Sequence, residues 1–296
     1  MQFLDVKTDF AFKKVFGSNE IKNILISFLN AIIDFEQGEK IVDLTIVDPY
    51  QIPVIKGMKD SFVDVSARLS NNKNVIIEMQ VLNVEGFEKR VLYNAAKAYS
   101  SQLKKSEVFT TLEPIIALTI TDFIMFKDVD KIITYFNLIE KESLIKYNDE
   151  IELIFVELPK FNKGEDELHS ITDKWIYFIK NAGDLEYTPK NLVNEITIKD
   201  AFEIANTAGM SEEELETQYR RHDFIRLQKG SLDLALKQGK IEGKIEGKIE
   251  GKIEGRQEKA IEVAKTLLSL GDDIERVSKA TGLTTEEINL IQIKQK

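Results

Sequence analysis

Two neighbouring segments of the chain carry side chains that could bind a metal ion: Asp64 in the first, and Glu78 and Gln80 in the second. Both segments alternate apolar and polar residues as strands do, so the three side chains can share one face of a hairpin. Two carboxylates and a carboxamide are hard oxygen donors that suit Mg²⁺, with Mn²⁺ as an alternative. Such an ion can polarise a phosphodiester and activate a water molecule for in-line attack. Geometry alone favours a solvated hairpin face, because exposed carboxylates are the rule.

The length of the turn decides whether these side chains meet. We expect strands at 62–69 and 75–81, with Asp64 on one face and Val63, Val65, Ala67 and Leu69 on the other. Residues that pair across the two strands share a face of the sheet. Asp64 therefore joins Glu78 and Gln80 only if the residue numbers of each cross-strand pair add up to an even number. That requires a turn of three or five residues, such as Asn71–Lys73. A two-residue turn would place the carboxylates on opposite faces.

The elements around this hairpin predict an α/β domain. Helical periodicity extends over 9–33, with Asp9 near the expected N-cap and a break at Gly17-Ser18-Asn19, and a strand is expected at 41–47. After the hairpin, a helical pattern covers 85–105, and the uninterrupted apolar run 115–121 indicates a strand buried on both faces. A strand at 151–158 and helices at about 171–182 and 199–206 complete the domain.

The composition excludes several classes of protein. The 40 lysines and arginines face 50 acids, for a net charge of −10, which argues against a protein that coats nucleic acid by bulk charge. The absence of cysteine excludes disulfides and thiolate catalysis and fits a cytoplasmic location. The longest apolar stretch, 115–126, is too short to span a bilayer, so we expect no membrane partner.

Several motifs resemble those of a known family. They are Thr8-Asp9-x-x-Phe12-Lys13-x-x-Phe16-Gly17, Val63-Asp64-Val65, Ile77-Glu78-Met79-Gln80, Val156-Glu157-Leu158-Pro159-Lys160-Phe161 and Asp173-Lys174-Trp175. With the order helix, three strands, helix, strand, the chain resembles the Rpn family of recombination-promoting nucleases and transposase-like proteins, in the PD-(D/E)XK nuclease superfamily. The resemblance implies a restriction-endonuclease-like αβββαβ core with a helical C-terminal tail.

The resemblance also implies an activity, which is metal-dependent endonuclease cleavage of DNA in recombination, mobile-element biology or phage defence. By this resemblance Asp64 and Glu78 are the metal ligands, and Gln80 stands where the superfamily usually has lysine. Glutamine can orient water or phosphate by hydrogen bonds but supplies no charge. The alternative is therefore a catalytically weak or inactive nuclease fold that acts as a binding and self-association module. Asp9 is a candidate outer-shell acid, although helix capping is the favoured explanation of it.

The helix expected after the hairpin carries candidate contacts to a DNA backbone. Its stripe at spacings of 4, 3, 4 and 3 comprises Arg90, Asn94, Lys97, Ser101 and Lys104, of which the three basic residues could bind phosphates. A solvated helix face opposite Leu92, Ala96, Tyr99 and Leu103 is an equal alternative.

After the nuclease-like domain, taken as 1–205, the composition changes. We expect a helical connector at 206–238, a fourfold Lys-Ile-Glu-Gly repeat within 239–255 and a helical module at 256–296. Glycine at every fourth residue costs a helix about 1 kcal/mol each, so the repeat is either a helix stabilised by a second copy or a spacer without fixed shape. Two short helices around Gly282 could form a helix-turn-helix, but Glu286 and Glu287 open the second one. We therefore favour a module that forms a homo-oligomer.

Overall fold

The computed structural model describes residues 3–35, 38–51, 61–103 and 106–294. The chain divides into two compact units, Met1–Gln228 and Lys229–Lys296. The first unit is an α/β domain and the second is helical, which confirms the expected fold class.

The N-terminal helical region is interrupted where the sequence predicts a break. Helix α1 (Asp9–Phe16) is followed by a short 3-10 helix, η1 (Asn19–Ile21), and by α2 (Lys22–Ile32). At Gly17 a Cβ atom would lie 2.6 Å from the carbonyl oxygen of Lys13, so only glycine fits. The N-cap of α1 is Thr8, whose Oγ1 accepts from the amide of Ala11, and the expectation that Asp9 caps this helix is wrong.

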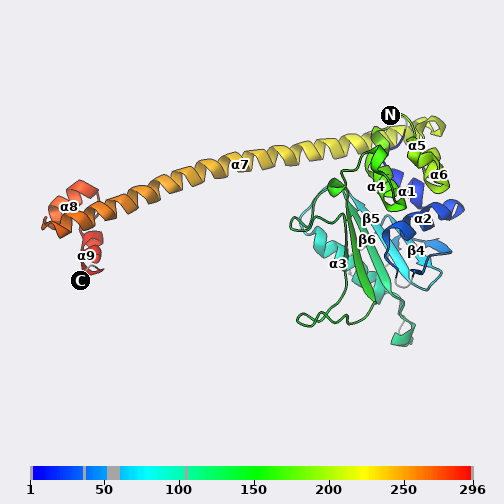
Figure 1. Cartoon of the computed structure of the whole chain (residues 1–296), viewed down its shortest axis with the longest axis horizontal. Coiled ribbons are helices and arrows are strands. Elements are labelled where there is room, and N and C mark those ends of the chain that lie inside the picture. The colour runs from blue at the N-terminus through cyan, green and yellow to red at the C-terminus, as the bar shows by residue number, and fades with distance from the viewer. Residues whose placement is uncertain (1–2, 36–37, 52–60, 104–105, 295–296) are drawn as a thin grey trace. The chain divides into compact units, whose positions relative to one another are not determined.

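A six-stranded sheet forms the centre of the first unit, in the order β1-β4-β5-β6-β8-β7 (Figure 1). The strands are β1 (Leu44–Val47), β4 (Val65–Leu69), β5 (Asn74–Gln80), β6 (Ile115–Thr121), β7 (Ile133–Phe136) and β8 (Ile151–Glu157). β5, β6 and β8 are parallel, and the other pairings are antiparallel. Every residue of β6 is buried, as its apolar run predicts. A separate two-stranded ladder joins β2 (Tyr50–Gln51) to β3 (Ser61–Phe62).

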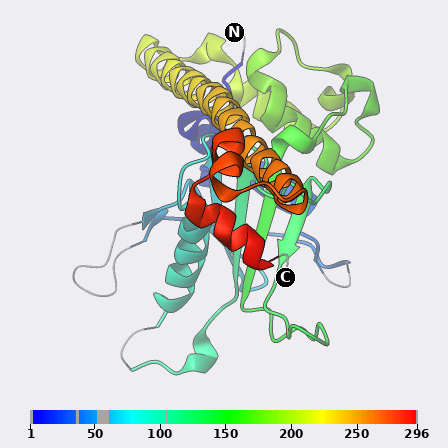
Figure 2. The ribbon, with the colours of Figure 1, turned by 90° about the vertical axis from the view of Figure 1, so that its left-hand side faces the viewer.

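Helices cover both faces of this sheet (Figures 1 and 2). The larger core packs α1, α2, α4 (Ile171–Asn181) and α6 (Ile196–Ala205) against Val65, Val75 and Ile77. On the other face, α3 (Phe87–Ser100) packs against Ile76, Ala117 and Phe155. The remaining short helices are α5 (Lys190–Val193), η3 (Phe109–Thr111), η4 (Leu158–Lys160), η5 (Glu165–Glu167), η6 (Ala182–Asp184) and η7 (Thr207–Gly209).

The hairpin of β4 and β5 has the even register that the site requires. Val65 pairs with Ile77, and the amide of Leu69 donates to the carbonyl of Lys73 at 2.8 Å. The turn is therefore Ser70–Asn72, one residue earlier than expected, with Asn72 in the left-handed region at φ 63°. Val63 packs with Ile76 on the α3 face, so the expectation that it shares a face with Val65 is wrong. The strand alternation begins only after Asp64, because regular pairing starts at Val65.

Helix α7 (Glu212–Ser269) begins in the first unit and runs without interruption through the Lys-Ile-Glu-Gly repeat. The structure therefore favours the helical alternative for the repeat. In the second unit, the end of α7 packs with α8 (Ile274–Thr281) and α9 (Thr285–Lys294) around Ala264, Val277 and Ile288. Asp273 caps α8, Gly282 ends it at φ 75°, and Thr284 forms the expected capping box with Glu287.

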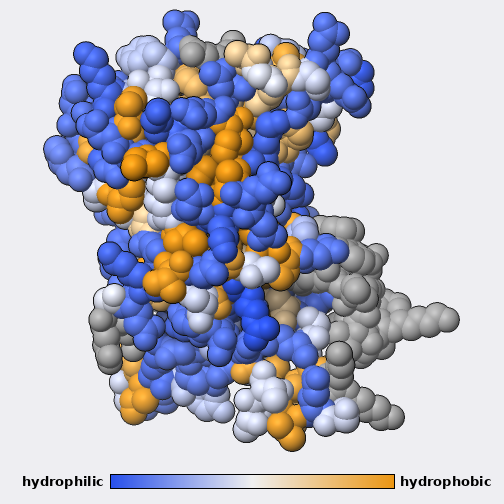
Figure 3. All heavy atoms as spheres, turned by 90° about the vertical axis from the view of Figure 1, so that its right-hand side faces the viewer, coloured by the Kyte–Doolittle hydropathy of each residue, from blue (hydrophilic) through white to orange (hydrophobic). Residues whose placement is uncertain are grey.

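The surface reflects the acid-rich composition. The side of the molecule in Figure 3 is mostly hydrophilic, with hydrophobic side chains in small groups. None of the described helices is long and apolar enough to cross a membrane.

Candidate active site

The carboxylates of Asp64 and Glu78 lie together at one end of the central hairpin. Asp64 immediately precedes β4, and its Oδ2 accepts a hydrogen bond from the amide of Met79 at 2.8 Å. This bond fixes Asp64 to the strand that carries Glu78. Only 13% of the Asp64 side chain and 15% of the Glu78 side chain is exposed, so both carboxylates are largely withdrawn from water.

Two cationic side chains approach the carboxylates from different helices. Lys13 of α1 places Nζ 3.4 Å from Oδ1 of Asp64. Arg90 of α3 places Nη2 2.6 Å from Oε1 of Glu78 and 2.6 Å from Oε1 of Gln80. Both cations are partly exposed, at 45% for Lys13 and 42% for Arg90. They can therefore move aside without opening the core.

Asn94 of α3 adds an amide to the site. Its Nδ2 lies 3.4 Å from Oε2 of Glu78, and Asn94 as a whole is only 3% exposed. Its Oδ1 is buried and has no hydrogen-bond partner among the described residues. Asn94 and Glu78 line a small pocket together with Val63 and Thr119. A buried acceptor without a donor is costly, so this pocket favours a ligand that offers a positive charge or a hydrogen-bond donor.

The pKa shifts of Asp64 and Glu78 also favour a positively charged ligand. Burial raises the pKa of Asp64, and the nearby Asp9 raises it further, whereas the Met79 amide and Lys13 lower it. Burial also raises the pKa of Glu78, with Arg90 opposing and Asp64 adding to the rise. Both ionised carboxylates are thus destabilised by desolvation, and each also by a nearby aspartate, Asp9 for Asp64 and Asp64 for Glu78. A divalent cation between them would reverse both effects.

These donors fit Mg²⁺ or Mn²⁺. In the described residues no group of three or more histidine, cysteine, aspartate or glutamate side chains could hold a metal. Magnesium, however, is usually bound through one or two carboxylates and keeps several of its waters. Asp64 and Glu78 would supply those carboxylates, and the buried Oδ1 of Asn94 would be an acceptor for a hydrogen bond from a metal-bound water.

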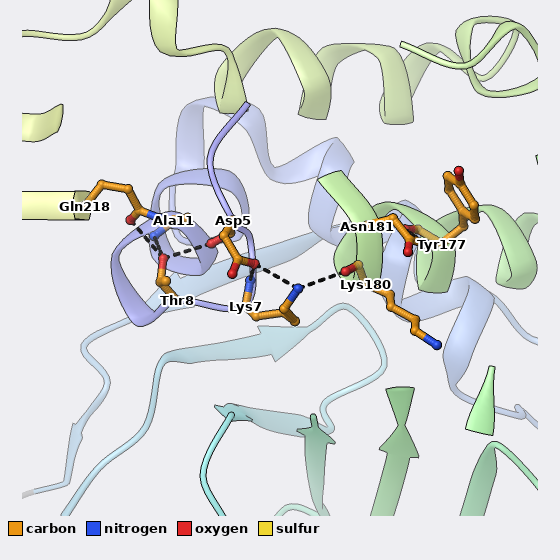
Figure 4. Close-up of polar contacts among 8 residues, drawn as sticks. All are labelled: Asp5, Lys7, Thr8, Ala11, Tyr177, Lys180, Asn181 and Gln218. Carbon is orange, nitrogen blue, oxygen red and sulfur yellow. Dashed lines mark hydrogen bonds and ion pairs between the residues drawn. The ribbon is translucent and has the colours of Figure 1, made fainter. Parts of the chain in front are cut away.

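The start of helix α1 is held in place by contacts with α7 and α4 (Figure 4). Thr8 donates from Oγ1 to Oε1 of Gln218 on α7 at 2.9 Å, and Lys7 donates to the carbonyl of Lys180 on α4 at 2.9 Å. Lys14 of α1 also forms an ion pair with Glu214 of α7 at 2.5 Å. These contacts set the position of the helix that carries Lys13.

Asp9 and the predicted basic stripe occupy different positions from those expected. Asp9 is half exposed, forms an ion pair with Arg221 at 3.3 Å and acts on Asp64 only through its charge. Along α3, Asn94 and Lys97 are 3% and 2% exposed, so the middle of the stripe faces the interior and the solvated-face alternative is wrong there, whereas Arg90 and Ser101 are exposed. A surface contact of Lys97 with a DNA backbone does not fit this burial, and Lys104 lies outside the described residues.

Sequence reasoning missed the ion pair of Glu157 with Lys160, 2.5 Å apart, at the end of β8. Glu157 is fully buried and accepts from the amides of Met125 and Phe126, so the pair anchors the loop after β6. An acid that ends an apolar strand run, three residues before a lysine, is the signal that could have identified it.

A mixed sheet between helices, with an acid before one strand and Glu-x-Gln on the next, defines a PD-(D/E)XK nuclease-like protein. Comparison with family models agrees: residues 6–235 match the PD-(D/E)XK nuclease family transposase model. Residues 257–292 match the C-terminal HTH domain of the Rpn/YhgA-like nuclease family. The chain therefore belongs to the PD-(D/E)XK nuclease family transposases, and both matches support its place among Rpn-type proteins. No curated protein and no solved structure matches it.

The second match bears on the C-terminal module. It supports the helix-turn-helix alternative rather than the association module that we favoured. One of the two acidic residues that argued against a helix-turn-helix has a local role, because Oε2 of Glu287 accepts from the amide of Thr284 at 2.8 Å. Glu287 is thus part of the helix cap, and its presence does not count against a helix-turn-helix.

Proposed function

We propose that the chain is a divalent-metal-dependent endonuclease that hydrolyses DNA phosphodiesters. The observation that carries this proposal is the desolvated pair of Asp64 and Glu78, with the unpartnered amide oxygen of Asn94 beside it. A nuclease or transposase-like role follows from the family. Hydrolysis, Mg²⁺ or Mn²⁺ as cofactor, and a cytoplasmic role in recombination, mobile elements or phage defence are proposals.

The residues of the chain would divide the work as follows. Asp64 and Glu78 hold the metal, which when bound polarises the phosphodiester and lowers the pKa of a coordinated water. Asn94 Oδ1 orients a water by accepting a hydrogen bond from it. Lys13 and Arg90 balance the carboxylates while no metal is present, and their exposed side lets them turn toward phosphate oxygens.

The test is nicking of supercoiled plasmid by the purified full-length protein with Mg²⁺ or Mn²⁺. Wild-type protein should nick in the presence of metal and lose nicking with EDTA. Asp64→Ala and Glu78→Ala should each lower the rate by at least about 100-fold, the scale of losing transition-state stabilisation at one group. Asp43→Ala is the matched control. Asp43 is an exposed acid that forms an ion pair with Lys22 and is not part of the proposed metal site.

Two outcomes would contradict the proposal. Equal nicking by all variants would mean that a contaminant cuts the plasmid. No nicking by the wild-type protein would favour the alternative, a catalytically weak or inactive nuclease fold that works by binding and self-association.

We also propose that the helix-turn-helix of the second unit binds DNA. Helices α8 and α9 are joined by a short turn at Gly282, the arrangement in which the second helix enters the major groove. Fluorescence anisotropy of a labelled duplex with EDTA present should show binding that weakens as salt rises. Binding unchanged by substitution of Asn289, on α9, together with Gln292 would count against this helix as the reader.

Self-association is proposed for helix α7. The isoleucines of its repeat, Ile241, Ile245, Ile249 and Ile253, are all at least 53% exposed. A Cβ atom added at any of the glycines between them would meet no neighbouring atom of the described residues within 4 Å outside the adjacent turns of the helix. Exposed apolar stripes on a helix are buried by a partner helix, and a second copy of the chain supplies an identical stripe. Changing these four isoleucines to glutamine should lower the mass measured by sedimentation equilibrium. Changing Lys240, Lys244, Lys248 and Lys252 to glutamine is the control, and a wild-type monomer would refute the proposal.

A further inference from the structure

The strand position that carries lysine in most of the superfamily carries Gln80 here, and an amide bears no charge. The structure places a cation at that position by another route. Arg90 reaches from α3 and places Nη2 2.6 Å from the Gln80 amide oxygen. The same nitrogen lies 2.6 Å from Glu78, so one guanidinium joins both polar residues of the Glu-x-Gln motif.

Gln80 is oriented to receive this guanidinium. Its Nε2 donates to the carbonyl of Leu82 at 2.6 Å, which fixes the amide nitrogen on the side away from Arg90. The amide oxygen therefore faces α3 as an acceptor. A lysine at this position would present an ammonium to the same space, and glutamine instead binds a cation that comes from the neighbouring helix.

The guanidinium of Arg90 also contacts an aromatic ring. Its guanidinium carbon lies 5.1 Å from the centre of the Phe87 ring, within the range of a cation–π contact, and Phe87 is 1% exposed. Three groups thus hold the guanidinium: the Glu78 carboxylate, the Gln80 amide and the Phe87 ring. The side chain is nevertheless 42% exposed, so one side of it remains open to a ligand.

We propose that Arg90, positioned by Gln80, supplies the positive charge that binds and polarises the scissile phosphate. This inference rests on the nuclease function proposed above. A divalent cation that takes Glu78 leaves Arg90 anchored by Gln80 and Phe87, next to the metal. A guanidinium presents several N–H donors in a plane and can bind two oxygens of one phosphate. Gln80 is then a positioning residue and Arg90 the phosphate-binding one.

In the described part of the chain, Lys13 and Lys97 are two further cations to compare with Arg90. Lys13 of α1 pairs with the other carboxylate, with its Nζ 3.4 Å from Oδ1 of Asp64. Lys97 is 2% exposed and so cannot meet a DNA strand from its present position. Of these three cations, Arg90 combines contact with Gln80, support from the Phe87 ring and an open side.

The test removes the positive charge from α3 and places one on β5 instead, by substitutions in the full-length protein. Arg90→Ala should lower kcat of plasmid nicking by about 100-fold while KM changes by less than about 3-fold, because a transition-state contact is lost. Gln80→Lys should restore kcat of the Arg90→Ala variant to within about 10-fold of wild type. Lys89→Ala, which removes an exposed charge from the same turn of α3, should leave kcat within about 2-fold.

A second measurement separates this role from a structural one. Binding of Mn²⁺ without DNA, measured by isothermal titration calorimetry, should be as tight or tighter in Arg90→Ala, because the arginine no longer competes for Glu78. Thermal unfolding should show that all variants fold.

The possible failures differ from one another. A wild-type protein that never nicks DNA refutes the nuclease function itself. An active wild type with an equally active Arg90→Ala variant, or a double variant no faster than Arg90→Ala, refutes only the role of Arg90. Loss of Mn²⁺ binding in Arg90→Ala would show that the arginine supports the metal site instead.

Discussion

Two glutamates of the central sheet, Glu78 and Glu157, have different kinds of hydrogen-bond partner, although each lies at or near the end of a parallel strand. Glu157 is fully buried, and its oxygens accept from two backbone amides at 2.6 and 3.1 Å and from Lys160 at 2.5 Å. Lys160 in turn donates to the carbonyls of Phe126 and Val129. Each member of this group has its partners within the fold, so the group has no room for a ligand.

Glu78 has only side-chain partners among the hydrogen bonds described for it. Arg90 is half exposed, and the Asn94 amide lies at 3.4 Å, near the limit of a hydrogen bond. Backbone donors are fixed by the fold, whereas a long side chain can turn away at little cost. Glu157, held by two backbone amides and Lys160, is therefore an anchor, whereas Glu78, held by side chains that can move, is able to accept a metal.

The largest effect expected from this comparison is on stability. Glu157→Ala should lower the free energy of unfolding by about 3 kcal/mol or more, because Lys160 and two amides lose their acceptor inside the protein. Chemical denaturation monitored by circular dichroism measures this change. Glu216→Ala, which removes an exposed ion pair with Arg220, is the control and should change stability by less than about 1 kcal/mol. A loss at Glu157 no greater than the control would contradict its role as an anchor.

The second effect is stabilisation by metal, which should depend on Glu78 and not on Glu157. At about 100 times the dissociation constant, Mg²⁺ or Mn²⁺ should stabilise the wild-type protein by about 2.7 kcal/mol. The shift in Tm should disappear in Asp64→Ala and Glu78→Ala and persist in Glu157→Gln. Sodium chloride at the same ionic strength is the control for screening. A metal-induced shift that survives in both alanine variants would place the metal elsewhere.

The smallest effect concerns charge at the site. The pKa of Asp64 is raised from 3.8 by burial, so the ionised carboxylate destabilises the fold, and stability falls as pH rises through the raised pKa. Asp64→Asn should therefore be more stable than wild type at pH 7.5 without metal, and the difference should shrink as pH falls toward about 4. Tm measured across this pH range tests it. A variant less stable than wild type at neutral pH would show that the Lys13 ion pair outweighs burial.

Much of the fold could be predicted because its signals are local. The apolar run of β6 and the break at Gly17 each depend on a few adjacent residues. The short strand β7, at one edge of the sheet, was missed because four residues carry too little periodicity. The Asp64–Glu78 pair could be expected from alternation and turn parity, which are also local.

The remainder of the site depends on how α3 packs. Its spacing of polar residues describes a stripe but does not say whether the stripe faces water or the sheet. Asn94 and Lys97 turn inward because the apolar residues Val91 and Ala95 beside them pack on the sheet. For the same reason the sequence could suggest Arg90 as a DNA contact but could not place it on Gln80.

The turn Ser70–Asn72 has a consequence for how this chain can vary. A change in its length keeps the site only if the turn itself takes up the added or lost residue, so that the residues of β4 and β5 keep their present partners. If the pairing slipped by one residue instead, every later side chain of β5 would pass to the other face of the sheet, which would move Glu78 among core residues and Ile77 to the face of α3. The length of this turn should therefore be free to vary only where the pairing of the two strands is preserved.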